Sequence, residues 1–176
     1  MNGESKVHKG SIVYRYTLRS NTIYLNITNR ARARANEVKE SDGESVWCGF
    51  GEPTLRLDIV LNLTRKMKED YPYIKVRLDT DGLAQIRHKD REVARELKDA
   101  GIDSVSISLN AESREKYDEL CKPSLSGSYQ AVLDFARDCR KYFSQVRLTV
   151  VKVEGINIPK CKRIAEELNC DFKVRG

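Results

Sequence analysis

The residues best suited to chemistry lie in one short segment, Gly49-Phe50-Gly51-Glu52-Pro53-Thr54. Glycine permits positive φ and lets the backbone approach a ligand closely, and Pro53 fixes the chain and removes one amide. We expect Glu52 at the carboxyl end of a strand, where α/β proteins usually bind ligands. A carboxylate there could accept hydrogen bonds from an ammonium group. The same segment also suits an ordinary strand–helix connection, with Glu52 favourable at the positive end of the helix dipole.

Other reactive side chains form no recognisable site. The sequence has no C-x-x-C pair, and its two histidines, His8 and His88, lie near no cysteine, so neither a disulfide framework nor a zinc site is indicated. We expect the free thiols to pack as small apolar groups; they are Cys48, Cys121, Cys139, Cys161 and Cys170. An unrelated barrel enzyme that uses Glu52, Asp79 or Asp81 as acid or base is the least supported alternative.

Composition predicts one globular domain over residues 1–176, with a polar tail at 1–9. No apolar run is long enough for a membrane span, and the first residues lack a secretory signal pattern, so we expect a cytoplasmic protein. The net charge of +6 would suit an anionic partner. Because both signs are mixed along the chain, a solvated surface is the favoured explanation of this charge. The densest basic segment contains Arg30, Arg32 and Arg34.

Hydrophobic periodicity predicts an α/β fold. Segments 11–18 and 22–28 alternate and read as a hairpin, and after them strands and helices take turns, which predicts parallel pairing. In the expected helix at 54–70, Ile59, Leu63 and Met67 form one stripe. The remaining expected strands are 45–49, 74–79, 103–110, 145–153 and 171–175, and the remaining helices are 90–100, 113–120, 128–143 and 158–168.

The predicted strands alternate apolar and polar residues, as in Val105-Ser106-Ile107-Ser108 and Val146-Arg147-Leu148-Thr149. The apolar set would pack under the helices, and the polar set would share the opposite face. These features predict a partial (β/α)6 TIM-like barrel of mainly parallel strands, with the N-terminal β-hairpin added. The alternative is an antiparallel sheet with one solvent-exposed face.

The order of these segments resembles the radical S-adenosylmethionine (SAM) superfamily. The runs "NTIYLNITNR", "CGFGEPTLRLD", "VRLDTDGLA", "AGIDSVSISLNAESREKYDELCKP", "VRLTVVKVEGIN" and "FKVRG" are most similar to the TatD-associated subgroup. The family's C-x-x-x-C-x-x-C motif, which holds a 4Fe–4S cluster, falls here on Ala31, Ala35 and Val38. Neither alanine nor valine can coordinate iron, and residues 31–44 form a shortened version of the cluster loop. One or two of the other thiols would not replace the three ligands.

The resemblance also implies a set of cofactor-binding residues. The glycine–glutamate turn would contact the SAM amino group, Ser108 and Asn110 would approach the ribose, and Arg147 would face the adenosine or the substrate. Thr80 would lie at the mouth of the third strand of the barrel. The full set is Gly49, Phe50, Gly51, Glu52, Pro53, Thr80, Ser108, Asn110 and Arg147.

These observations predict a radical SAM-like core that lacks its cluster ligands, cannot cleave SAM reductively and retains weak affinity for SAM or adenosine. The alternative is a non-catalytic module that binds phosphate, RNA or a protein through the basic segment Arg30–Arg34. A partial barrel leaves strand edges that a homodimer contact or a C-terminal extension would cover. The sequence leaves open the parent family's substrate and whether the cysteine loss is natural or introduced.

Overall fold

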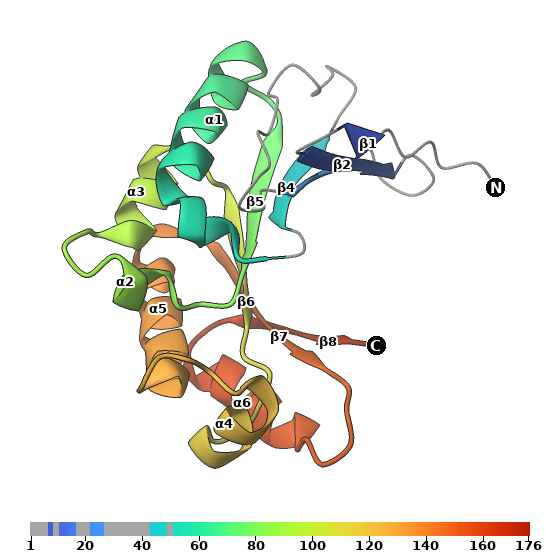
Figure 1. Cartoon of the computed structure of the whole chain (residues 1–176), viewed down its shortest axis with the longest axis vertical. Helices are drawn as coiled ribbons and strands as arrows, with labels where there is room; N and C mark the ends of the chain where they lie inside the picture. The colour runs from blue at the N-terminus through green and yellow to red at the C-terminus, as the bar shows by residue number, and fades with distance from the viewer. Residues whose placement is uncertain (1–6, 9–10, 17–21, 27–42, 49–50) are drawn as a thin grey trace. The chain divides into compact units, whose positions relative to one another are not determined.

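The structure, a computed structural model, describes residues 7–8, 11–16, 22–26, 43–48 and 51–176 (Figure 1). The chain divides into two compact units. The N-terminal unit comprises residues 1–79 and 96–103, and the C-terminal unit comprises residues 80–95 and 104–176. The extent of a single domain over 1–176 therefore stays a prediction. Within the described ranges, no helix is both long enough and apolar enough to cross a membrane.

The sheet of the N-terminal unit contains β1 (Val7–His8), β2 (Ser11–Tyr16), β3 (Thr22–Asn26), β4 (Glu44–Cys48) and β5 (Lys75–Thr80) in that order (Figure 1). The pairs β1–β2 and β2–β3 are antiparallel, whereas β3–β4 and β4–β5 are parallel. The predicted N-terminal hairpin is thus confirmed as β2–β3. The two-residue strand β1 was not predicted, because it is too short to show a periodic pattern.

One helix covers the apolar face of β4 and β5. After the 3-10 turn η2 (Pro53–Arg56), α1 (Leu57–Asp70) buries Leu57, Val60, Leu61, Thr64 and Met67. Trp47 is fully buried beneath it, and its indole Nε1 donates to Thr64 Oγ1 at 2.9 Å. Of the predicted stripe only Met67 is buried, while Ile59 and Leu63 lie half-buried at its edge. The buried face is centred on Val60, Leu61 and Thr64, and the predicted stripe follows only its edge.

A charged contact fixes the start of β5 in the N-terminal unit. Asp103 Oδ2 accepts hydrogen bonds from Lys68 Nζ at 2.7 Å and from the Val76 amide at 2.8 Å. Lys68 Nζ also donates to the Ile74 carbonyl at 2.6 Å. Gly101, at φ 101°, lies so close that an added Cβ would stand 2.7 Å from Lys68 Cγ. The contact therefore needs a glycine in the left-handed region at this position.

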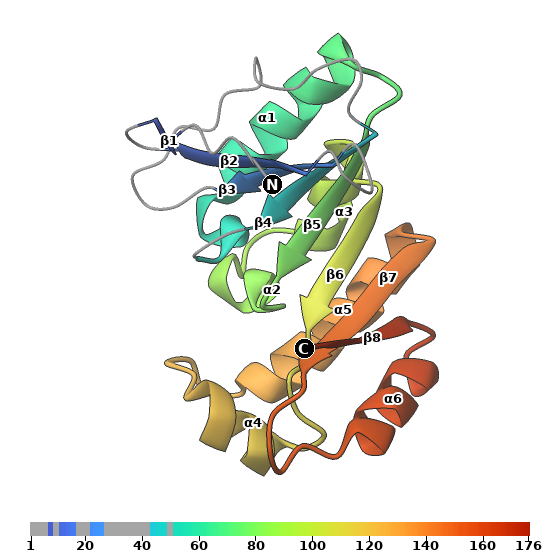
Figure 2. The ribbon, with the colours of Figure 1, turned by 90° about the vertical axis from the view of Figure 1, so that its right-hand side faces the viewer.

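The sheet of the C-terminal unit is fully parallel and contains β6 (Ser104–Ser108), β7 (Gln145–Val151) and β8 (Asp171–Arg175) (Figure 2). Its helices are α2 (Ala84–Arg87), α4 (Arg114–Cys121), α5 (Ser128–Tyr142) and α6 (Ile158–Glu167), and α3 (Val93–Asp99) spans the boundary between the units. The strands and longer helices match the predicted ranges to within a few residues at each end. The four-residue helix α2 was not predicted.

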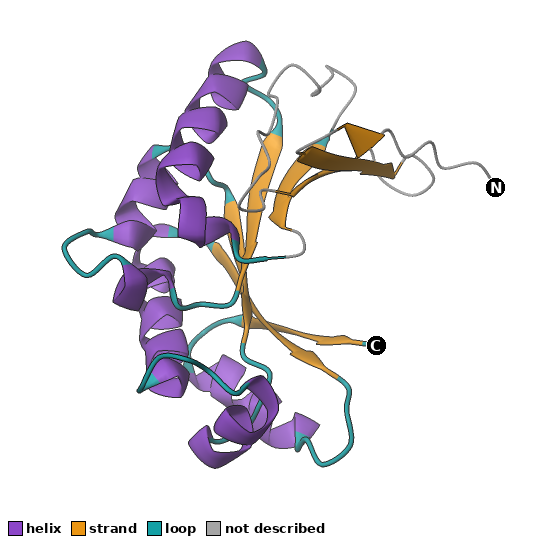
Figure 3. Cartoon of the chain, in the orientation of Figure 1, coloured by secondary structure: helices purple, strands orange, loops and turns teal. Residues whose placement is uncertain are grey.

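The faces of β6–β8 follow the predicted alternation. Ile107, Leu148 and Phe172 are in register on one face, which α5 and α6 cover (Figure 3). Ser106, Arg147 and Asp171 are in register on the other face. The parallel registers contradict the antiparallel alternative. The α/β class with mainly parallel strands is confirmed, and the strand–helix alternation is that of a partial TIM-like barrel.

Candidate functional site

The Glu52 turn is held in a defined conformation within the N-terminal unit. Glu52 is the N-cap of η2, and its Oε1 accepts hydrogen bonds from the Thr54 amide at 3.0 Å and from Thr54 Oγ1 at 2.6 Å. Gly51 has φ 153°, a conformation that L side chains rarely adopt. Pro53 and Thr54 are buried, so the turn is anchored below the half-buried carboxylate. Gly49 and Phe50 lie outside the described residues. A SAM-binding role for the turn stays a prediction.

Thr80 ends β5, as predicted, and its hydroxyl serves the turn that follows. Its side chain is 4% exposed, and Oγ1 accepts from the Gly82 amide at 3.2 Å. Asp81 closes the same turn through Leu83, whose amide donates to Oδ1 at 2.9 Å. Gly82 has φ 80°, and a Cβ there would lie 2.8 Å from Ile107 Cγ2. Thr80 shares the side of β5 that carries Leu78, away from Arg77 and Asp79. These contacts give the Thr80 hydroxyl a structural task that the sequence does not reveal.

Of the residues predicted to bind the ribose and adenosine, the structure brings Ser108 and Arg147 onto one face. Ser108 ends β6 and is in register with Thr149 on β7, while Arg147 stands two residues earlier on β7. Neighbours at such diagonal positions are about 7–8 Å apart, within reach of one ligand. Both side chains are half-buried.

Asn110 departs from that face. It has φ 61°, and its backbone amide donates to the Thr149 carbonyl at 3.2 Å. Its side-chain Nδ2 lies 3.7 Å from Cys121 Sγ. Asparagine tolerates this left-handed conformation better than most residues. The side chain therefore ties the end of β6 to α4. Its predicted contact with a ribose stays a prediction.

The polar face of β4 and β5 carries a charged group that sequence reasoning did not place in a site. Arg77 Nε donates to Glu44 Oε1 at 3.2 Å, and Arg77 Nη1 donates to Asp79 Oδ1 at 2.6 Å. The side chains of Arg77 and Asp79 are each 18% exposed. Alternation placed Arg77 and Asp79 on one face, but nothing in the sequence paired Glu44, thirty-three positions earlier, with Arg77.

The polar face of β6–β8 carries further groups that the predicted site did not include. Ser106 is buried and accepts from Arg175 Nη2 at 3.4 Å, and Lys173 is in register with Thr149. The signal for these residues was present in the alternation of Phe172-Lys173-Val174-Arg175. The parallel register of β8 against β7 was needed to place them beside Arg147.

The described thiols do not suit an iron–sulfur cluster. Burial raises the pKa of Cys139, and it raises the pKa of Cys161 and Cys170 to about 11, so these thiols stay protonated at neutral pH. Burial also raises the pKa of Cys121. Among the described residues, no group of three His, Cys, Asp or Glu side chains could hold a metal ion. Ala31, Ala35 and Val38 lie outside the described residues, but by composition they supply no thiolate. The described residues therefore supply no three-ligand site for a cluster.

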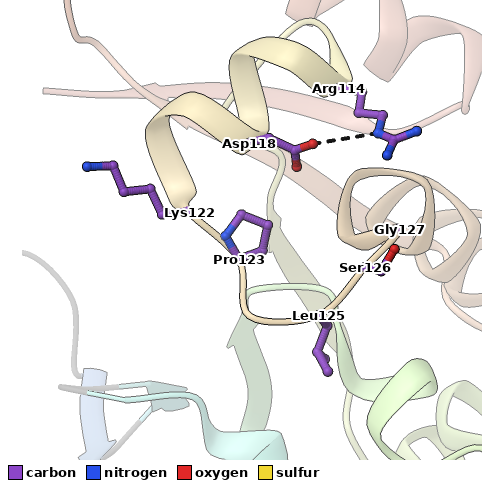
Figure 4. A pocket seen from close by; sticks show the side chains of 7 residues that line it. All are labelled: Arg114, Asp118, Lys122, Pro123, Leu125, Ser126 and Gly127. Atoms are coloured by element: carbon purple, nitrogen blue, oxygen red, sulfur yellow. Dashed lines mark ion pairs between the residues drawn. The ribbon is translucent and has the colours of Figure 1, made fainter.

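A surface pocket of about 400 Å³ lies between α4 and the start of α5 (Figure 4). Arg114 and Asp118, one turn apart on α4, form an ion pair with Nε and Oδ2 3.6 Å apart, and Lys122 points away from both. Its other lining residues are Pro123, Leu125, Ser126 and Gly127. No residue predicted to bind the cofactor is among those that line it.

Comparison with known proteins identifies the family. The radical SAM superfamily model matches residues 14–168. The chain belongs to the radical SAM superfamily. This confirms the resemblance at the level of the superfamily, while membership of the TatD-associated subgroup stays a prediction. The family uses SAM and a 4Fe–4S cluster as cofactors.

Individual relatives agree with the family. The chain is 31% identical over 132 residues to the GTP 3',8-cyclase of Limosilactobacillus fermentum, covering 74% of this chain and 35% of that protein. It is 33% identical over 128 residues to the probable GTP 3',8-cyclase of Pyrococcus horikoshii, covering 70% and 37%. The chain thus spans about a third of the length of these curated relatives.

A solved structure supports the fold. The structure of TYW1 with a lysine-pyruvate adduct bound matches with a TM-score of 0.56 at 16% identity. The match covers 77% of this chain and 43% of that one.

Proposed function

We propose that this chain is a radical SAM core domain that does not assemble the family's 4Fe–4S cluster and does not cleave SAM reductively. The observation that supports this is the identity of residues 31, 35 and 38: two alanines and a valine where the family places three cysteines. Thiolates hold such clusters, and the described thiols are either buried or isolated. The family chemistry therefore has no site here on which to start.

We further propose that the ligand face of the family persists. The Glu52 turn keeps its conformation through hydrogen bonds made inside the turn. In the C-terminal unit, Ser108 and Arg147 share the polar face of the parallel strands. Strand alternation and the helices on the opposite face fix these positions, and neither depends on iron. Weak binding of SAM or an adenosine fragment is the retained activity that these features support.

Reconstitution with iron tests the proposal directly. The purified chain is incubated anaerobically with ferrous iron and sulfide, and bound iron and visible absorption are measured. It is then reduced in the presence of SAM and assayed for 5′-deoxyadenosine by chromatography. We expect no bound cluster and no 5′-deoxyadenosine. A stoichiometric cluster that yields 5′-deoxyadenosine would contradict the proposal.

Restoring the ligands provides the matched control. The combined variant Ala31→Cys, Ala35→Cys and Val38→Cys supplies three thiolates at the family's spacing. We expect it to take up iron under the conditions in which the parent chain does not. Calorimetric titration with SAM, in the absence of iron, tests the retained ligand face. A Glu52→Gln variant should weaken binding, whereas Glu69→Gln on the exposed side of α1 should not.

The alternative module that binds phosphate, RNA or a protein through Arg30–Arg34 falls outside the described residues. It stays a prediction, as do a homodimer through the strand edges and a cytoplasmic location. The activity named for the GTP 3',8-cyclases belongs to those longer proteins.

A further inference from the structure

Three cations gather on the polar face of β7 and β8: Arg147, Lys173 and Arg175, which we call the cationic strip. The registers fix their positions, because Arg147 opposes Asp171, Thr149 opposes Lys173, and Val151 opposes Arg175. Strands in a sheet lie about 4.8 Å apart, so these side chains project from neighbouring positions. Asp171 is the only carboxylate on this face of the described strands β6–β8.

Arg147 stands at one end of the strip, opposite Asp171. It is half-buried, and within the described part of the chain its guanidinium makes no hydrogen bond or ion pair, although Asp171 stands opposite it. Lys173 likewise has no hydrogen bond or ion pair among the described residues, and it is exposed. A half-buried guanidinium has lost part of its hydration, and its five donors are strongly favoured to find acceptors.

Arg175 adds a second guanidinium beside the first. Its Nη2 donates to Ser106 Oγ at 3.4 Å, so the side chain reaches from β8 across β7 to β6. Ser106 is in register with Arg147 and is 2% exposed. The bond therefore directs Arg175 toward the residue next to Arg147. Like charges that approach each other repel, and a bound anion would offset the repulsion between the two guanidinium groups.

We propose that the cationic strip binds the phosphate groups of a small-molecule ligand. Guanidinium groups match phosphate oxygens through paired hydrogen bonds. Three cations beside the serine and threonine hydroxyls of this face favour a ligand group with more than one negative charge over a single carboxylate. SAM carries no phosphate group, so the phosphate ligand is a molecule other than SAM that binds to the same strand face. This inference relies on the proposed function only in taking the polar strand face as the ligand face.

The test is calorimetric titration of the full chain, at low salt, with inorganic tripolyphosphate as the probe. Citrate, with its several carboxylates, serves as the competing anion. The variants are Arg147→Gln and Lys173→Gln. Arg163→Gln is the matched control, because Arg163 lies exposed on α6 and its loss removes the same charge from the same unit. Circular dichroism confirms that each variant is folded.

We expect tripolyphosphate to bind, and Arg147→Gln to weaken its Kd roughly tenfold, the effect of losing hydrogen bonds to a charged group. Lys173→Gln should weaken binding less, because its side chain is more exposed, and Arg163→Gln should leave the Kd unchanged. Absence of tripolyphosphate binding, equal losses in all three variants, or tighter binding of citrate would each overturn the proposal. The iron and SAM assays use neither tripolyphosphate nor these variants, so failure of the proposed function is distinguished from failure of the strip.

Discussion

The polar strand faces of the two units differ in whether their arginines form ion pairs. On β4 and β5, Arg77 is joined to Glu44 and Asp79 by ion pairs of 3.2 and 2.6 Å. On β7 and β8, Arg147 has no ion pair in the described part of the chain, although Asp171 stands opposite. Loss of one partner from such a pair leaves a largely buried charge without compensation, whereas a cation left without a carboxylate is available to a ligand. The comparison assigns a structural role to the first face and a binding role to the second.

Removing Arg77 should have the largest effect on stability. The Arg77→Ala variant leaves Glu44 and Asp79 without their shared cation, and breaking a largely buried pair costs about 3 kcal/mol in the free energy of unfolding. Urea unfolding followed by circular dichroism measures the change. Glu44→Gln is the milder companion, because Arg77 keeps Asp79, and we expect it to cost about 1 kcal/mol. If Arg77→Ala unfolds at the same urea concentration as the parent, the first face does not stabilise the fold.

Asp103 extends the comparison to the pH dependence of the N-terminal unit. Burial alone would raise the pKa of Asp103, but the hydrogen bonds from Lys68 and the Val76 amide and the charges of Lys68 and Lys75 outweigh it and lower the pKa. A lowered pKa means that ionised Asp103 stabilises the folded state above its ordinary value near 4, and that this contribution is lost as the pH falls below that value.

We therefore expect Asp103→Asn to lower the free energy of unfolding by about 2 kcal/mol at pH 7. The difference between variant and parent should shrink as the pH approaches 3. Urea unfolding across this range measures both quantities. A difference that stays constant with pH would show that Asp103 acts through packing and not through its charge.

The smallest stability effect is expected on the second face. Arg147→Gln removes a cation that has no ion pair among the described residues, so the free energy of unfolding should change by less than about 0.5 kcal/mol. The melting temperature of the variant, compared with that of Arg163→Gln, provides the measurement. A loss as large as that of Arg77→Ala would mean that Arg147 is a structural residue, and the contrast between the faces would fail.

Sequence periodicity was sufficient for most of the fold. The alternation in Val105–Ser108 and in Val146–Thr149 predicted which residues share each face, and the registers confirm it. Helix ends were predicted well where capping signals are local. The buried stripe of α1 was misplaced because the predicted i, i+4, i+8 spacing follows only one edge of the broader face that Val60, Leu61 and Thr64 occupy. The short elements β1 and α2 carry too few residues for any pattern.

Less of the candidate site than of the fold could be predicted from the sequence. The glycine–glutamate turn and the missing cysteines are local features, and the family comparison agrees with the motif order. The sequence did not predict the hydrogen bonds. The Thr80 hydroxyl accepts from the Gly82 amide within a turn, and the side-chain amide of Asn110 lies against Cys121 Sγ. Such contacts depend on backbone geometry at positive φ and on a helix eleven residues away.

The amino-acid sequence by itself determined the family, the parallel α/β plan and the absence of thiolates at residues 31, 35 and 38, because each depends on residue identity and periodic spacing. The tertiary structure decided which charges meet. Glu44 reaches Arg77, and Arg175 reaches Ser106 across an intervening strand, only through the register of neighbouring strands. Charge pairing depends on distances of a few ångströms, and those distances are set by the folding of segments that lie far apart along the chain.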